Sequence, residues 1–88
     1  MKNLKKNKLI GKRIYVHGWQ YDNSGTLLDG VITEIVEAKD KFGRLAFTLK
    51  TIDAERTLYW RIIKELIDNG FYKSNKFLNS GTNATILP

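Results

Sequence analysis

The chain has no cysteine and only one histidine, and these two facts exclude several classes of function. Without cysteine there is no disulfide framework and no thiolate metal site, so we expect a reducing compartment, the cytoplasm. His17 alone provides no metal-ligand spacing, and no glycine-rich phosphate loop follows a strand. A catalytic pair would need His17 beside one of several unremarkable serines. The sequence therefore predicts no enzyme, no metal site and no cofactor.

Long apolar runs are also absent. The first residues, "MKNLKKNKLIGKR", are charged and are not followed by an apolar stretch, which predicts neither a signal peptide nor a membrane span. The 88 residues, 42% of them hydrophobic and 11% aromatic, suffice for one small domain with a real core and modest stability.

The net charge of +6 is concentrated at one end of the chain. Residues 1–13 contain six basic side chains and no acidic one, whereas the other residues carry nine basic and nine acidic side chains. A basic segment of this kind is typical of an arm that binds polyanions, although a solubilising tail or an AT-rich genome would leave the same pattern. We predict a flexible basic arm over residues 1–9 and a single small β-barrel domain over residues 10–88.

Hydrophobic periodicity predicts mainly strands. The first strand covers residues 10–21, with Gly18 as a candidate bulge, and a turn signal follows at residues 22–25. Residues 26–38 form a second strand that Asp29-Gly30 interrupts as either a bulge or a tight hairpin. "KDKFGR" is then a charged turn in which Gly43 can adopt positive φ, and residues 45–52 alternate as a third strand.

One helix is predicted near residues 58–69. Apolar side chains at four-residue spacing form two adjacent rows, Leu58/Ile62/Leu66 and Tyr59/Ile63/Ile67. Asn69-Gly70 marks its C-terminal end, whereas residues 57–60 fit either its first turn or a short strand. Residues 71–83 read mostly as loop, and 84–87 as a closing strand. The predicted fold class is mostly β with one helix (α+β): a strongly bent antiparallel β-barrel of about five strands.

Three segments, "GKRIYVHG", "DGVITEIVEA" and "GRLAFTLKT", resemble the small Src-homology-type barrels of the Tudor and KOW kind. The resemblance covers residues 11–52 and implies a binding role, for nucleic acid or for protein tails, more than catalysis. The loop "WQYDNSGTLL" is longer than a KOW turn, and the helix after residue 57 departs from the usual pattern.

Alternation within the first strand separates rings from aliphatic side chains. Tyr15, His17 and Trp19 fall on one face, and Ile14 and Val16 on the other, which suits the barrel interior. The rings form either a surface on which unpaired bases stack or a second, minor core beneath the helix or the C-terminal loop.

Two hypotheses of function follow. The first is a small non-enzymatic nucleic-acid-binding accessory module with a site of the single-stranded or RNA type. Its candidate residues are Lys5, Lys6, Lys8, Lys12, Arg13, Tyr15, His17 and Trp19. The second is a protein-interaction module or inhibitor, of the kind that phages and mobile elements encode. It binds a protein partner, with a homodimer as one form, through an aromatic patch. Its candidate residues are Trp19, Tyr21 and Trp60.

Overall fold

The computed structural model describes residues 5–20, 25–74 and 80–88. Within these ranges a single turn of 3-10 helix, η1 (Lys6–Leu9), precedes seven strands and one α-helix. In chain order these are β1 (Arg13–Gln20), β2 (Gly25–Val31), β3 (Glu34–Lys39), β4 (Leu45–Lys50), β5 (Glu55–Tyr59), α1 (Trp60–Asn69), β6 (Phe71–Tyr72) and β7 (Ser80–Leu87). The prediction of a mostly β fold with one helix is confirmed.

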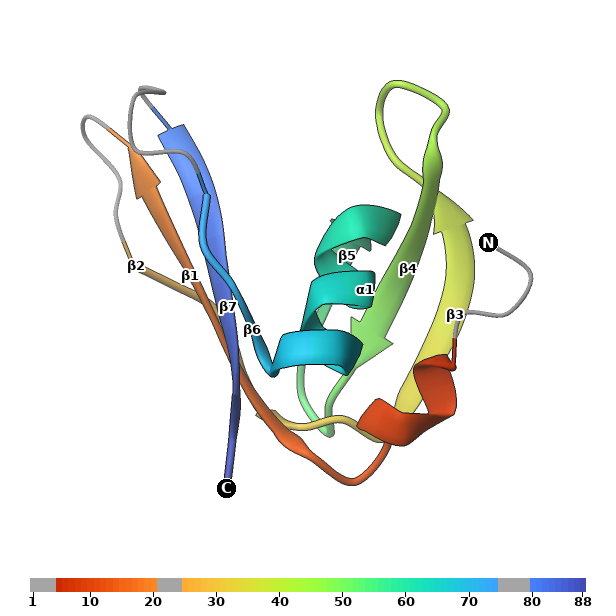
Figure 1. The fold of residues 1–88 in the computed structure, drawn as a ribbon, viewed down its shortest axis with the longest axis vertical. Helices are drawn as coiled ribbons and strands as arrows, with labels where there is room; N and C mark the ends of the chain where they lie inside the picture. Colours follow the sequence, from red (N-terminus) through yellow and green to blue (C-terminus); the bar gives the residue numbers. More distant parts are fainter. Residues whose placement is uncertain (1–4, 21–24, 75–79) are drawn as a thin grey trace.

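The strands form two antiparallel sheets. The first sheet has the order β2-β1-β7-β6 and the second has the order β3-β4-β5. The sheets diverge like the arms of a V, with α1 between them (Figure 1). Among the described residues no ladder of hydrogen bonds joins the two sheets, so the closed barrel stays unconfirmed.

The core fills the space between the sheets. Ile14 and Val16 of β1 and Leu49 of β4 are fully buried there, and Ile63 of α1 is buried among them. The helix thus uses its predicted apolar face to hold the two sheets together. It ends at Gly70, whose φ of 83° and N–H bond to the Leu66 carbonyl confirm the predicted left-handed cap.

Several predicted boundaries were wrong. The predicted second strand is two strands, because the chain leaves the first sheet at Ile32-Thr33 and enters the second. The choice that the sequence left open at residues 57–60 is a strand up to Tyr59: Leu58 and Tyr59 belong to β5, since they pair with β4, and the helix begins at Trp60. The predicted loop after the helix contains β6 and the start of β7.

The bulge near Gly18 lies on the neighbouring strand. Val16 pairs with Leu28 and His17 with Thr26, so Leu27 of β2 is the extra residue. Because β1 itself stays regular against β7, its alternation is not reset.

The described part of the predicted arm is folded. Residues 6–9 form η1, and Leu9 is only 3% exposed within the core. Burial of this one leucine fixes a lysine-rich segment against α1. Residues 1–4 lie outside the described residues, so the bounds of the arm and of the domain stay a prediction. The described residues include no helix with both the length and the hydropathy that a membrane span needs.

Candidate nucleic-acid interface

The two predicted faces of β1 are present for residues 14–17. Ile14 and Val16 are completely buried, whereas Tyr15 and His17 are half-buried on the opposite face. Their ring centroids are 6.0 Å apart and their planes differ by 27°. Trp19 continues β1 opposite Gly81 of β7, but its side chain lies outside the described part of the structure, as does Tyr21.

This outer face of the first sheet points away from the helix. In Figure 1 α1 lies on the inner side of the sheet, and no element of the described residues covers the outer side. Thr85 pairs with both Tyr15 and Phe71, which places Phe71, 56% exposed, on the same face. The helix therefore does not bury these rings in a second core; residues 75–79 lie outside the described residues.

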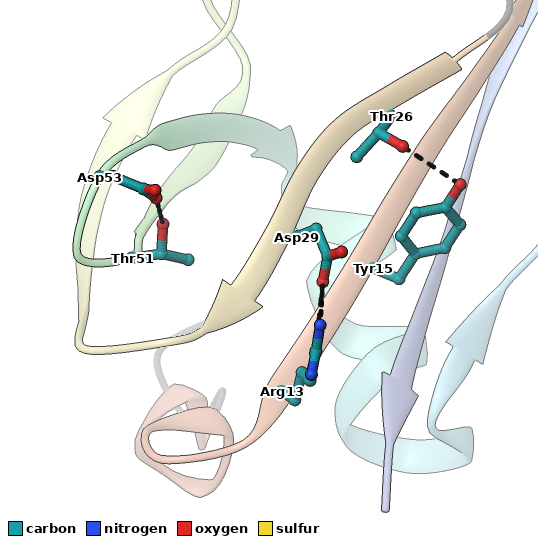
Figure 2. Close-up of polar contacts among 6 residues, drawn as sticks. All are labelled: Arg13, Tyr15, Thr26, Asp29, Thr51 and Asp53. Carbon is teal, nitrogen blue, oxygen red and sulfur yellow. Dashed lines mark hydrogen bonds and ion pairs between the residues drawn. The ribbon is translucent and has the colours of Figure 1, made fainter.

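The outer face carries almost no net charge. Arg13 donates from its guanidinium to a carboxylate oxygen of Asp29 at 3.2 Å, and Thr26 donates to the Tyr15 hydroxyl at 3.3 Å (Figure 2). The four strands of this sheet contain one arginine, Arg13, and one aspartate, Asp29, and no lysine or glutamate. A polyanion would find no surplus cation on these strands.

The structure separates the predicted lysines from the rings. Lys6 places its ammonium group 5.5 Å from the ring centroid of Phe47, on β4 of the second sheet. Lys8 and Lys12 line a hollow beside the C-terminal end of α1. Among the predicted residues, Arg13, Tyr15 and His17 are thus brought together, whereas the side chains of η1 lie elsewhere, because Leu9 anchors that turn near the helix.

A second surface, which the sequence analysis did not identify, lies at the turn between β3 and β4. This turn projects from the end of the second sheet (Figure 1). Beside it is a cleft of about 490 Å³. The residues that line this hairpin cleft are Lys39, Asp40, Lys41, Phe42, Arg44, Arg56, Thr57, Leu58, Tyr59, Ile62 and Thr82. Four of these described residues are basic and one is acidic, which makes the hairpin cleft cationic.

Cations and aromatic rings alternate along one side of this cleft. The guanidinium of Arg44 lies 4.0 Å from the ring centroid of Tyr59 and 4.9 Å from that of Phe42. The Lys41 ammonium lies 5.3 Å from the Phe42 ring, which is 69% exposed. These distances are within the range of cation–π attraction.

The series continues onto α1. Tyr59 meets Trp60 edge-on, with centroids 5.5 Å apart, and the Arg61 guanidinium lies 5.4 Å from the Trp60 ring. We call the six side chains the cation–ring ladder: Lys41, Phe42, Arg44, Tyr59, Trp60 and Arg61. Trp60, predicted as an anchor for a protein partner, is thus a half-buried member of a basic surface.

Asp40 organises the turn that carries Lys41, Phe42 and Arg44, three members of this ladder. One carboxylate oxygen accepts the backbone N–H groups of Phe42 and Arg44 at 2.9 Å each, and the other accepts the Arg44 Nε–H at 2.7 Å. Gly43 has a φ of 79°, which confirms its predicted role. Desolvation alone would raise the pKa of Asp40, but the hydrogen bonds from Arg44 and Phe42 outweigh it and lower the pKa. The carboxylate is therefore ionised at neutral pH and can accept all three hydrogen bonds.

The described residues bring together no group of three or more side chains that could hold a metal ion. No protein-family model matches the chain, and comparisons with curated proteins and with solved structures also gave no match. The resemblance to Tudor and KOW barrels therefore stays a prediction, and the argument for function rests on the two surfaces themselves.

Proposed function

We propose that the protein is a small non-enzymatic nucleic-acid-binding module whose contact surface is the hairpin cleft. The observation that carries this proposal is the surplus of positive charge beside exposed aromatic surface. Phosphates supply most of the affinity of such complexes through the release of counterions, and bases add stacking on rings. The hairpin cleft offers cations to the phosphates and aromatic rings to the bases.

The cations of the hairpin cleft are available for phosphates. None of the ion pairs within the described residues involves Lys39, Lys41 or Arg56. By contrast, the one cation that the four strands of the first sheet carry in their described residues, Arg13, is paired with Asp29. This contrast moves the proposed site from β1 to the cleft. A cytoplasmic location and an origin in a phage or mobile element are further parts of the proposal that the composition suggests.

Fluorescence polarisation with labelled oligonucleotides, at two salt concentrations, tests the proposal. The key variant replaces Lys39, Lys41 and Arg56 by glutamine. The matched control replaces Lys5, Lys6 and Lys8 by glutamine, so both variants lose three positive charges. On single strands each lost phosphate contact reduces the log–log salt slope by about 0.7, so the cleft variant should lose up to about 2 units of slope.

The control variant should keep most of the slope of the wild type. Equal losses in the two variants would show that net charge, and not the cleft, attracts the ligand. If the wild type binds no oligonucleotide at low salt, the proposed function is wrong.

A second candidate function is supported by the outer face of the first sheet. Its neutrality, together with the exposure of Phe71 (56%) and Val31 (48%), suits a protein partner better than a polyanion. We propose that any protein partner, a second copy included, binds there. Tyr15→Ala combined with Phe71→Ala should abolish capture of such a partner, or dimerisation in sedimentation, while oligonucleotide binding stays unchanged. Capture that survives both substitutions would reject this face.

A further inference from the structure

The cation–ring ladder limits which nucleic acids the hairpin cleft can take. We propose that the cleft selects unpaired strands and that a base stacks on Phe42. Asp40 is the positioning residue, whose hydrogen bonds hold Phe42 and Arg44 in the conformation that binds the base. This inference rests on the function proposed above and adds the class of ligand and the residues that distinguish it.

Phe42 is the member of the ladder that can receive a base. It stands in the five-residue turn between β3 and β4, and 69% of its surface is exposed. Lys41 approaches its ring on a flexible side chain that can swing to a phosphate, which leaves ring surface for a ligand. Base–aromatic stacking requires an open base face, and in a duplex neighbouring base pairs cover both faces.

The space beside Phe42 fits this class of ligand. At about 490 Å³ the cleft lies within the range of small-molecule pockets, about 300–1,000 Å³. Its lining combines buried apolar side chains, Leu58 and Ile62, with exposed basic ones. A base can therefore enter while its phosphates stay near Lys39, Lys41 or Arg56.

Asp40 holds two members of the ladder in place before any ligand binds: the backbone at Phe42 and the guanidinium of Arg44. Its carboxylate holds the backbone at Phe42 and Arg44 and also the guanidinium that lies over Tyr59. Side chains ordered in advance lose less conformational freedom on binding, which raises affinity without any new contact. Lysine in place of Arg44 would keep the charge but lose the planar group that stacks on rings.

The test compares an oligothymidylate, an oligouridylate and a blunt DNA duplex of equal length at one salt concentration. We expect both single strands to bind more tightly than the duplex, since stacking tolerates either sugar. Phe42→Ala should weaken single-strand binding roughly 5–150-fold, the loss of one stacked base, without changing the salt slope. Phe71→Ala is the matched control, since Phe71 is also exposed but lies on the first sheet; it should change affinity less than twofold.

The positioning role has its own readout. Arg44→Lys keeps the charge, so it should weaken single-strand binding several-fold and leave duplex binding unchanged. Asp40→Asn also removes a negative charge from the cleft, so it should strengthen duplex binding somewhat and lower the ratio of single-strand to duplex affinity several-fold. Both variants should keep the melting temperature within a few degrees of the wild type. Equal affinity for duplex and single strands, or no effect of Phe42→Ala, would overturn the inference while salt-dependent binding through the cleft could stand. Absence of all oligonucleotide binding would instead remove the proposed function itself.

Discussion

Ile63 offers the strictest test of how the two sheets are held together. It is fully buried on α1, in the middle of the core cluster between the sheets. Among the described residues no hydrogen-bonded ladder joins those sheets, so the shared apolar core, to which α1 contributes, holds them together. Ile52, at 94% exposed, provides a matched control in which the same atoms are removed from a position in solvent.

Ile63→Ala should lower the free energy of unfolding by about 2–5 kcal/mol, because the removed atoms lose their burial and leave a cavity. A chain of this length is stable by about 4–13 kcal/mol in total, so the change is a large fraction. A loss of about 3 kcal/mol corresponds to a fall in melting temperature of about 12–24 °C in a domain of this size. Ile52→Ala should change the free energy by less than about 0.5 kcal/mol.

Urea unfolding followed by circular dichroism measures both values. A loss below about 1 kcal/mol for Ile63→Ala, or similar losses for the two variants, would refute the assignment of the helix as the joint between the sheets. Two separate transitions in the wild type would also refute it, because a shared core unfolds as one unit.

Two further predictions concern single turns. Gly70→Ala should lower the free energy of unfolding by about 1 kcal/mol through backbone strain alone, since φ is 83° and no atom lies within 4 Å of an added Cβ. Gly70→Asn should lower it less, because asparagine tolerates the left-handed conformation better than alanine. Equal thermal stability of the wild type and both variants would contradict the left-handed cap. The pKa of the Asp40 carboxyl is lowered in the folded state from its ordinary value of 3.8. Its ionised form therefore stabilises the fold at pH values above 3.8, and this stabilisation is lost as the pH falls through the folded-state pKa. The difference in melting temperature between wild type and Asp40→Asn should therefore stay constant near neutral pH and shrink only below about pH 4; a difference that shrinks near pH 6 would point to another group.

Local patterns predicted those elements that local forces determine. The faces of β1 follow from strict alternation, and the end of α1 follows from Asn69-Gly70. Residues 57–59 could not be decided in the same way, because Leu58 and Tyr59 continue the helical rows and also fit a strand. These residues form a strand because they pair with β4, and such pairing depends on the tertiary structure and not on the local sequence.

Long-range contacts explain the other differences. Much of β7 is polar, and it is a strand because it pairs with β1 along its whole length. Leu9 stands in a lysine-rich segment, and its burial depends on distant parts of the chain, α1 among them. The turn "KDKFGR" was predicted correctly as a charged turn, but its partners in the cleft, Arg56 and Tyr59, come from β5. An aromatic residue between basic residues in a turn was the one local signal of this surface.

An NMR titration tests the central claim most directly, since that claim is the location of the site. Oligothymidylate added to isotopically labelled protein should shift the backbone amide signals of residues 39–44 and 56–59, together with the Trp60 indole, in a salt-dependent manner. The amides of Tyr15, His17 and Thr85 on the outer face of the first sheet should remain in place. Shifts confined to that face or to residues 5–8, with residues 39–44 unchanged, would contradict the account.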